Sequence, residues 1–446
     1  MALLKWRKSI ISGQNVLLIK GRSVACYLWI FCYMKILVVS NLYPPHGIGG
    51  YEERCFNTIN TLKQRGHDVH VLTSNHKVDD RSSVEEPHVT RKLRVHGFYG
   101  HPWLPIYDLY KLEKENQQTL ATTIATVQPD VISVWNMGGI SKALLHTLEA
   151  LPTPLVYDIS DHWIARSLIA DVWLSWWNEP GSMTRNILRA LAGASGVRKY
   201  IDKQVPTGSV RSLKFKNIYF CSQFMRDLTA KQGYPVAHAD IVYCGVEHEL
   251  FKRKTEFQPP RRFIWVGRLA EDKDPMTTIK GFLMARKQSG LPLSLDIYGR
   301  GDADYVQQLE AEIQQNDTDK AICIWSATHE EMRQLYCNYD AYIFSSNWGE
   351  PFALTPLEAM SANLPVIMCP DGGDAELVED GVNALQFVAG SPDSLSGAIL
   401  RLLEMNDSGK QMSETARKQV EENYTIDSMT QKIESILQRA CGHLEH

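Results

Sequence analysis

The sequence lacks the features by which disulfide-stabilised, zinc-binding and nucleic-acid-binding proteins are usually recognised. Its nine cysteines are scattered singly, with no C-x-x-C pair, which argues against a disulfide framework or a zinc site and suits a reducing compartment. The formal net charge is only −4 over 446 residues, so there is no overall basic surface for nucleic acid. A globular chain of this length predicts two domains.

Long hydrophobic runs are scarce, and a short one lies close to the N-terminus. Residues 24–34, VACYLWIFCYM, follow five cations and end at Lys35, whereas a bilayer span needs roughly 20 apolar residues. No small-residue cleavage site follows this run. We therefore expect an extended start site upstream of Met34, with residues 1–33 poorly ordered, and a weak membrane tether is the alternative.

From Met34 onward, β-branched runs alternate with amphipathic segments, which is typical of parallel α/β domains. The first βαβ unit comprises KILVVS at 35–40, a helix from about Tyr51 and VHVLTS at 69–74. Further strands are predicted at 130–135, 154–159, 217–222, 240–246, 262–267, 293–299, 321–326, 341–346, 365–370 and 384–388.

A charged, proline-rich stretch at 252–261 separates two such alternating series. We predict an α/β fold of two facing Rossmann-like, doubly wound domains, at 34–256 and 257–408, with a cleft between them. Residues 409–446 are predicted to be helices that pack back toward the N-terminal domain. In open α/β sheets, ligands bind beyond the carboxyl ends of the strands, so we expect the functional residues in the loops there.

The loop after the first strand carries Gly47-Ile48-Gly49-Gly50 just before a helix. Glycines allow close backbone approach, and a helix N-terminus favours an anion. The alternative is an ordinary strand-to-helix turn, because the spacing is not that of the dinucleotide fingerprint.

Two loops of the second series carry cations and glycines. "VGRLAEDKDP" holds Arg268 and Lys273, which could together bind a diphosphate, although two solvated cations beside acids are the alternative. "IYGRGDAD" holds Gly299 and Gly301, where bare backbone could border a planar base. Its Asp302-Ala303-Asp304 imitates the D-x-D metal motif, a tripeptide frequent by chance, and we expect no metal.

"NWGEPFALTPLEAM" places Glu350 in a loop and Glu358 eight positions later in a helix. Thr355 to Glu358 also reads as a capping box, which is the local structural alternative. "CPDGGDAELVEDG" then adds two glycines after the next strand. Because four consecutive strand ends carry cations, glycines, acids and glycines, the functional interpretation is favoured.

These residues carry a family resemblance. "NLYPPHGIGGYEE", "GRLAEDKDP", "YGRGD" and the E-x7-E block with its glycine sequel resemble the retaining GT-B glycosyltransferases of family 4, over about nine-tenths of the chain. By this resemblance, Arg268 and Lys273 neutralise the donor diphosphate, Glu350 lies near the donor sugar and Glu358 binds the ribose. The other implied donor-binding residues are Gly299, Gly301, Phe352, Ala353, Leu354, Gly49 and Gly50.

The resemblance implies transfer of a sugar from a nucleotide-diphosphate-sugar donor to a glycan or lipid-linked acceptor with retention of configuration. It implies neither cofactor nor metal. One departure concerns "VYDISDHW", in which Ser160 stands where many relatives have histidine. Either His162 takes that role or the acceptor-side histidine is absent, and we expect Asp161 or His162 to contact the acceptor.

Residues 163–177 are rich in tryptophan, and a basic series follows them: Arg185, Arg189, Arg198, Lys199, Lys203, Arg211, Lys214 and Lys216. Aromatic faces beside cations could dock a glycan or an anionic membrane surface, and a helical hairpin with a solvated basic face is the alternative. We expect a cytoplasmic protein, with peripheral contact on the cytoplasmic face of the membrane as a further expectation.

Three other functions compete with sugar transfer. A non-hydrolysing nucleotide-sugar 2-epimerase shares the two-domain fold, but it fits the E-x7-E block less well. A nicotinamide oxidoreductase needs G-x-G-x-x-G and an acid ending the second strand, and VLTSN supplies none. A catalytically silent sugar-nucleotide-binding protein remains open from the sequence, although both glutamates and both cations are retained.

Overall fold

The computed structural model describes residues 17–19, 22–24, 33–47, 49–78, 86–165, 171–405 and 407–443. The chain divides into the compact units Met1–Tyr33 and Met34–His446. In the first unit, strands β1 (Leu17–Ile19) and β2 (Arg22–Val24) pair antiparallel. Residues 25–32, most of the apolar run discussed as a tether, lie outside the described residues.

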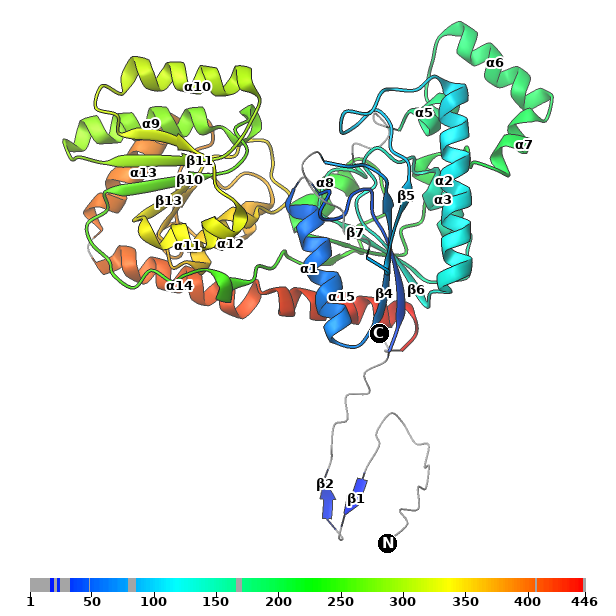
Figure 1. The fold of residues 1–446 in the computed structure, drawn as a ribbon, viewed down its shortest axis with the longest axis horizontal. Helices are drawn as coiled ribbons and strands as arrows, with labels where there is room; N and C mark the ends of the chain where they lie inside the picture. The colour runs from blue at the N-terminus through cyan, green and yellow to red at the C-terminus, as the bar shows by residue number, and fades with distance from the viewer. Residues whose placement is uncertain are drawn as a thin grey trace. The chain divides into compact units, whose positions relative to one another are not determined.

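The second unit begins with a seven-stranded parallel sheet of order β5-β4-β3-β6-β7-β8-β9, which we call the N-lobe sheet (Figure 1). Its strands are β3 (Lys35–Val39), β4 (Asp68–Ser74), β5 (Val89–Leu93), β6 (Val131–Val134), β7 (Leu155–Ile159), β8 (Asn217–Phe220) and β9 (Asp240–Ile241). The order reverses direction between β3 and β6, so this is the switch point of the lobe.

Helices cover both faces of the N-lobe sheet because the strands alternate their side chains. Ile36 and Val38 of β3 pack toward α1 and the C-terminal helix α15 (Ile426–Ala440), whereas Leu37 and Val39 join the cluster that contains α2. The helices are α1 (Gly50–Gln64), α2 (Ile106–Val127), α3 (Ala143–Glu149), α5 (Val172–Asn178), α6 (Met183–Ala194), α7 (Val197–Asp202) and α8 (Gln223–Lys231).

The C-lobe sheet has six parallel strands in the order β12-β11-β10-β13-β14-β15, with its switch point between β10 and β13. The strands are β10 (Arg262–Val266), β11 (Ser294–Tyr298), β12 (Ile322–Trp325), β13 (Ala341–Phe344), β14 (Val366–Met368) and β15 (Leu385–Gln386). The lobe's helices are α9 (Pro275–Ser289), α10 (Ala303–Asn316), α11 (His329–Leu335), α12 (Leu354–Ser361), α13 (Pro392–Glu404) and α14 (Asp407–Asn423). The predicted fold class, two doubly wound parallel domains, is confirmed.

The C-terminal part of the chain contacts both lobes. Helix α14 packs on α12, whereas α15 (Ile426–Ala440) packs on α1, where Arg65 pairs with Asp427 and Glu434 at 2.6 Å each. Thr425 lies in the link between α14 and α15 and forms a parallel bridge with Val246, which lies in the connection from the N lobe to the C lobe. The two segments that connect the lobes therefore run side by side. No helix among the described residues is both long enough and apolar enough to cross a bilayer.

Candidate active site

Two loops at the C-lobe switch point are joined by hydrogen bonds. One loop follows β10 and carries Lys273, and the other follows β13 and carries Glu350. The carbonyl oxygen of Asp272 accepts hydrogen bonds from Asn347 N at 3.2 Å and from Ser346 Oγ at 3.0 Å. These contacts hold together the loops that the sequence marked as cationic and acidic.

The centre of the site is an ion pair between Lys273 Nζ and Glu350 Oε1. Ser346 Oγ donates a hydrogen bond to the same carboxylate oxygen, and Lys273 Nζ lies 5.4 Å from the centroid of the Trp348 ring. The Glu350 side chain is almost completely buried, and that of Lys273 is mostly buried. Opposite charges are thus held next to each other in a place from which water is largely excluded, where electrostatic effects are strong.

The glycines after β14 allow the Glu350 loop to lie against the next strand end. Gly372 has a φ of +89°, and a Cβ on Gly373 would lie 1.9 Å from the carbonyl oxygen of Pro351. Gly373 N donates to Glu350 O at 2.7 Å. The nearby Asp374 is fully buried and accepts from Ala353 N at 2.7 Å. Burial, and then the charge of Glu350, raise the pKa of Asp374 well above its ordinary value.

Arg268, the second predicted cation, does not join this pair. Its guanidinium donates to Asp272 at 2.8 Å within its own loop, and 62% of its side chain is exposed. The alternative that we gave for this cation, a solvated charge beside acids, describes its contact in this structure. The loop nevertheless lies against that of Glu350 through the backbone of Asp272.

Gly299 and Gly301 are required where two strand-end loops meet. A Cβ on Gly299 would lie 2.1 Å from the carbonyl oxygen of Gly267, and one on Gly301 would lie 1.9 Å from that of Leu269. Leu269 and Gly301 form a parallel bridge. Asp302, the first acid of the D-x-D tripeptide, caps α10 by accepting from Asp304 N at 3.0 Å.

Glu358 lies in a network that the sequence did not predict. Its Oε1 lies 3.2 Å from His329 Nε2, and its Oε2 accepts from Tyr336 Oη at 3.0 Å. His329 Nδ1 in turn lies 3.0 Å from Glu53 Oε1 on α1, so the imidazole links the two lobes. Hydrogen bonds to Glu358 and Glu53 raise the pKa of His329 to about 10.

The capping box that we gave as the structural alternative for Glu358 is wrong. Helix α12 starts at Leu354, with Ala353 as its N-cap, so Thr355 lies inside the first turn. The Thr355 hydroxyl accepts from Tyr342 Oη at 2.8 Å instead of capping the helix. The Glu358 carboxylate is therefore available for contacts outside its own helix.

The glycine loop of the N lobe reaches the C lobe. Gly49 is the N-cap of α1, and its N–H donates to Glu52 Oε2 at 2.8 Å. A Cβ on Gly50 would lie 2.9 Å from Leu354 Cδ1, so this loop touches the start of α12. Ile48 lies outside the described residues.

The end of β7 brings His162 to the Glu350 loop. His162 Nε2 lies 3.2 Å from the carbonyl oxygen of Gly349, and its ring centroid lies 5.1 Å from that of Trp348. Ser160, which stands at the family's histidine position, turns inward and donates to Asp158 Oδ1 at 2.8 Å. Asp158 is buried in an ion pair with Arg54. Of the candidates at this strand end, His162 contacts the opposite lobe.

Comparison with known proteins decides the family. The family model Glycosyltransferase Family 4 matches residues 48–250, and the model Glycosyl transferases group 1 matches residues 246–419. The chain belongs to the family 4 glycosyltransferases. It is 24% identical to an uncharacterized glycosyltransferase of Methanocaldococcus jannaschii, over 90% of this chain and 96% of that protein. It is 23% identical to the sulfoquinovosyl transferase SQD2 of Arabidopsis thaliana, over 86% of this chain and 70% of that protein.

A solved structure shares the fold of this glycosyltransferase. The Anabaena protein HepE, solved in complex with UDP and glucose, superimposes with a TM-score of 0.63 at 18% identity, covering 91% of this chain and 100% of that chain. This likeness supports the predicted GT-B fold. The family matches do not favour the epimerase, oxidoreductase or silent-binder alternatives.

Three of the predicted donor-binding residues of the glycosyltransferase, Phe352, Ala353 and Leu354, make contacts within the protein. Phe352 is buried against Tyr243 and Tyr424, with ring centroids 5.2 and 5.8 Å away, so its ring belongs to the contact between the lobes. The Ala353 N–H is already bonded to Asp374, and Leu354 touches the glycine loop. The phenylalanine ring thus has a packing role that the motif did not reveal.

The tryptophan-rich segment of the glycosyltransferase is mainly core. Trp163, Trp173 and Trp177 are buried, so the interpretation that these aromatic faces dock a ligand is wrong for them. The cause is tertiary packing: Trp173 and Trp177 pack edge to face with centroids 5.8 Å apart. Residues 166–170 lie outside the described residues.

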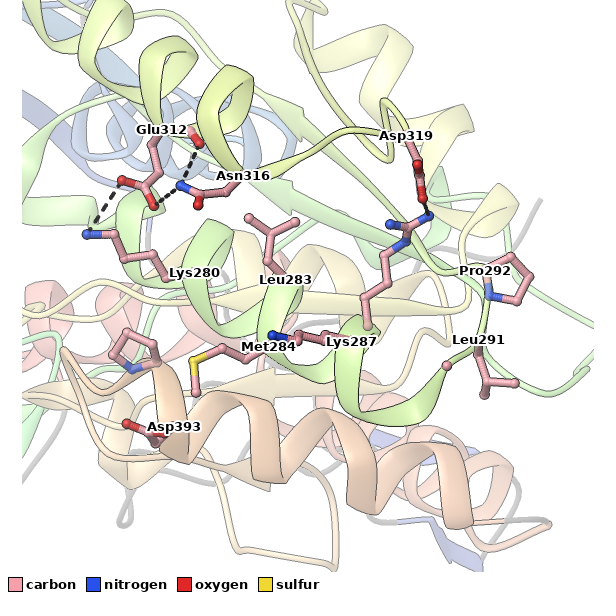
Figure 2. A pocket seen from close by; sticks show the side chains of 13 residues that line it. Lys280, Leu283, Met284, Lys287, Leu291, Pro292, Glu312, Asn316, Asp319 and Asp393 are labelled. Carbon is pink, nitrogen blue, oxygen red and sulfur yellow. Dashed lines mark hydrogen bonds and ion pairs between the residues drawn. The ribbon is translucent and has the colours of Figure 1, made fainter.

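A hollow of about 870 Å³ lies on the outside of the C lobe, away from these contacts (Figure 2). Lys280 Nζ of α9 and Glu312 Oε2 of α10 form an ion pair at 3.7 Å in its lining, and Asp393 lines it from the start of α13. Neither Lys273 nor Glu350 lines this hollow, so it is separate from the candidate active site of the glycosyltransferase.

Proposed function

We propose that the protein transfers a hexose from a nucleotide-diphosphate sugar to a glycan or lipid-linked acceptor with retention of anomeric configuration and without a metal. The observation that carries the proposal is the Lys273–Glu350 ion pair at the switch point of the C lobe. Ligands of open α/β sheets bind at such points. The complex of the Anabaena neighbour with UDP-glucose supports a nucleotide-sugar donor for this fold.

The charge distribution of the site suits the two partial charges of glycosyl transfer. As the bond to the diphosphate breaks, positive charge develops on the sugar and negative charge on the leaving group. Lys273 stabilises the leaving diphosphate, and Arg268 reaches it by exchanging Asp272 for phosphate oxygens, for which a guanidinium is well suited. Glu350 lies beside the sugar and stabilises its positive charge.

Glu358 binds the ribose hydroxyls in this proposal. Its carboxylate is held by Tyr336 and His329, which fix its direction while leaving lone pairs to accept further hydrogen bonds. Gly299 and Gly301 border the base, and Gly49 and Gly50 close over the phosphates. The contact between Gly50 and Leu354 supports such a closing role, because it already joins the two lobes at this point.

On the acceptor side, Asp161 or His162 contacts the reacting hydroxyl. His162 stands between the lobes, with Nε2 on the Gly349 carbonyl next to Glu350, so a hydroxyl held here would approach the donor sugar. We also propose that the enzyme acts in the cytoplasm. The buried thiols of Cys55, Cys221, Cys244 and Cys369 form no disulfide, which is expected in a reducing compartment.

The test is a release assay for nucleoside diphosphate over candidate donors. Binding of a true donor raises the apparent melting temperature, so a thermal-shift screen selects the donors to assay. We expect Glu350→Gln to lower release by about 10²- to 10³-fold, the usual cost of removing one transition-state contact. Glu310→Gln, at an exposed acid of α10, is the matched control. Unchanged release in Glu350→Gln would contradict the proposal.

The product separates the remaining functions. Transfer yields nucleoside diphosphate together with a lengthened acceptor whose new linkage has the anomeric configuration of the donor. An epimerase would instead change the sugar of the donor with no acceptor present, and a silent binding protein would show a thermal shift without release. Inversion of configuration would overturn the retaining mechanism alone.

A further inference from the structure

Helices α6 and α7 expose an apolar face. The two helices contain no buried residue, and the exposed fractions are 80% for Met183, 60% for Leu191 and 66% for Tyr200. The α6–α7 apolar face comprises Met183, Ile187, Leu188, Leu191, Val197 and Tyr200. Within α6 the spacing of four residues from Met183 to Ile187 to Leu191 places these side chains on one side of the helix. Figure 1 shows both helices at the outer end of the N lobe, beyond α5.

The polar side of α6 faces the protein. Arg189 Nη1 donates to the carbonyl oxygens of Trp176 at 3.2 Å and Glu179 at 2.8 Å. Arg185 Nη2 donates to Glu179 O at 2.9 Å and also to Pro180 O. An amphipathic helix on a globular protein normally packs its apolar side inward. Here the contacts of Arg185 and Arg189 hold α6 in the reverse orientation, so its apolar side faces solvent.

Helix α7 is held in the same way. Arg198 donates to Thr207 Oγ1 at 3.3 Å and to Thr207 O at 3.2 Å, and its guanidinium lies 5.3 Å from the centroid of the Trp177 ring. Tyr200 then points to solvent on the same short helix. Both helices are therefore anchored through their cations.

The charge of this region selects the partner. Residues 182–204 contain five arginines and lysines and one acid, Asp202. The Asp202 carboxylate already accepts hydrogen bonds from Thr207 N at 2.7 Å and Thr207 Oγ1 at 2.8 Å. Lys199 and Lys203 are exposed beside the apolar face. Apolar side chains flanked by lysines complement a surface that is apolar inside and anionic outside.

We propose that the α6–α7 apolar face binds the surface of an anionic lipid bilayer. Helix α6 has 12 residues and is about 18 Å long, too short to span a bilayer but suited to lying in its interface. Lysines beside it gain from the negative potential of anionic lipids. This binding does not depend on the proposed transfer reaction, although it would hold the acceptor lobe next to a lipid-linked acceptor.

Vesicle co-sedimentation of the full chain tests the proposal. The probes are large vesicles of phosphatidylcholine alone and of phosphatidylcholine mixed with phosphatidylglycerol. We expect the protein to sediment with the mixed vesicles, and Ile187→Glu combined with Leu191→Glu to weaken binding at least tenfold, since apolar burial is replaced by like charge. Val388→Glu, at a C-lobe valine that is 66% exposed, is the matched control and should bind as the unmodified protein does.

Four results would overturn the proposal. The first is absence of sedimentation with the mixed vesicles, and the second is unchanged binding by the double variant. The third is a concentration-dependent dimer, seen by light scattering and lost in the double variant, without vesicle binding, which would assign the face to a second copy. The fourth is equal binding to both vesicle types, because the proposed surface is anionic. Release of nucleoside diphosphate in solution should be the same in the double variant, so vesicle binding and catalysis fail independently.

Discussion

Lys273 and Glu350 lie 77 residues apart in the chain and form an ion pair beside the Trp348 ring. Their two loops leave neighbouring strands of the C-lobe sheet and are held together through the backbone of Asp272. The pair places a cation for the leaving diphosphate next to an acid for the sugar. Replacing either residue should therefore affect both catalysis and stability.

The first prediction concerns Lys273→Met. Loss of the ammonium should lower nucleoside diphosphate release by about 10²- to 10³-fold. It should also destabilise the fold by about 1–3 kcal/mol, because Glu350 would be left buried without its cation. Urea unfolding and the release assay measure the two effects. In the double variant with Glu350→Gln, stability should recover and activity should not. A double variant as unstable as Lys273→Met would contradict the paired-charge explanation.

The second prediction concerns the pH dependence of stability. The pKa of His329 rises from 6.5 to about 10 through its hydrogen bonds to Glu358 and Glu53. Because the folded protein holds this proton more tightly than the unfolded chain, the stabilisation is fully present below pH 6.5 and is lost as pH rises through about 10. The difference in unfolding free energy between the unmodified protein and His329→Gln should therefore shrink as pH rises from 6.5 to about 10. A constant difference between pH 6.5 and 10 would exclude the charged bridge.

The third prediction compares two glycine substitutions. Gly301→Ala places a Cβ 1.9 Å from the Leu269 carbonyl oxygen and should displace the loop that leads to Arg268. We expect a loss of about 1–3 kcal/mol in stability and weaker donor binding. Gly397→Ala lies in α13 with open space around the new Cβ and should stabilise the protein by about 0.5–1 kcal/mol. Chemical denaturation of both variants checks the opposite signs, and equal effects would argue against the close approach.

The fourth prediction concerns His162, which contacts the Gly349 carbonyl beside Glu350. His162→Ala should lower kcat for transfer by about 10²-fold if the imidazole positions the reacting hydroxyl. Hydrolysis of the donor by water should fall less, because water does not depend on the acceptor site. Ser160→Ala is the control, since its hydroxyl turns to Asp158 inside the lobe. Unchanged transfer kinetics in His162→Ala would remove this residue from the acceptor site.

The alternation of apolar runs was enough to predict all six strands of the C-lobe sheet and six of the seven strands of the N-lobe sheet, because the central strands of a parallel sheet are buried. The edge strand β5 was not predicted, since its sequence VTRKL has no apolar run and only Leu93 is buried. The strand-end loops were also predictable, and the structure brings Lys273 and Glu350 together there. Local sequence could not show that Arg268 pairs with Asp272, since the choice between solvated and clustered cations depends on side-chain direction.

The bridge through His329 was missed for a related reason. It joins α1, α11 and α12, and the sequence gives no signal that the imidazole on α11 will contact one acid from each of the other two helices. The burial of Trp173 and Trp177 likewise depends on tertiary packing. The sequence of a tryptophan-rich helix does not show whether the helix lies in the core or on the surface. Six exposed large apolar residues are instead on α6 and α7, which follow that segment.

The bridge between Val246 and Thr425 places both connections between the lobes at one point. A Cβ on Gly245 would lie 2.3 Å from the Thr425 carbonyl oxygen, so the two connecting segments are closely packed here. They cannot separate or slide without breaking the bridge between Val246 and Thr425. Any rotation that admits a nucleotide must bend both connections together, about a common axis. The enzyme should consequently open and shut along one path, and a bulky side chain at Gly245 should slow substrate entry and product exit far from the reacting atoms.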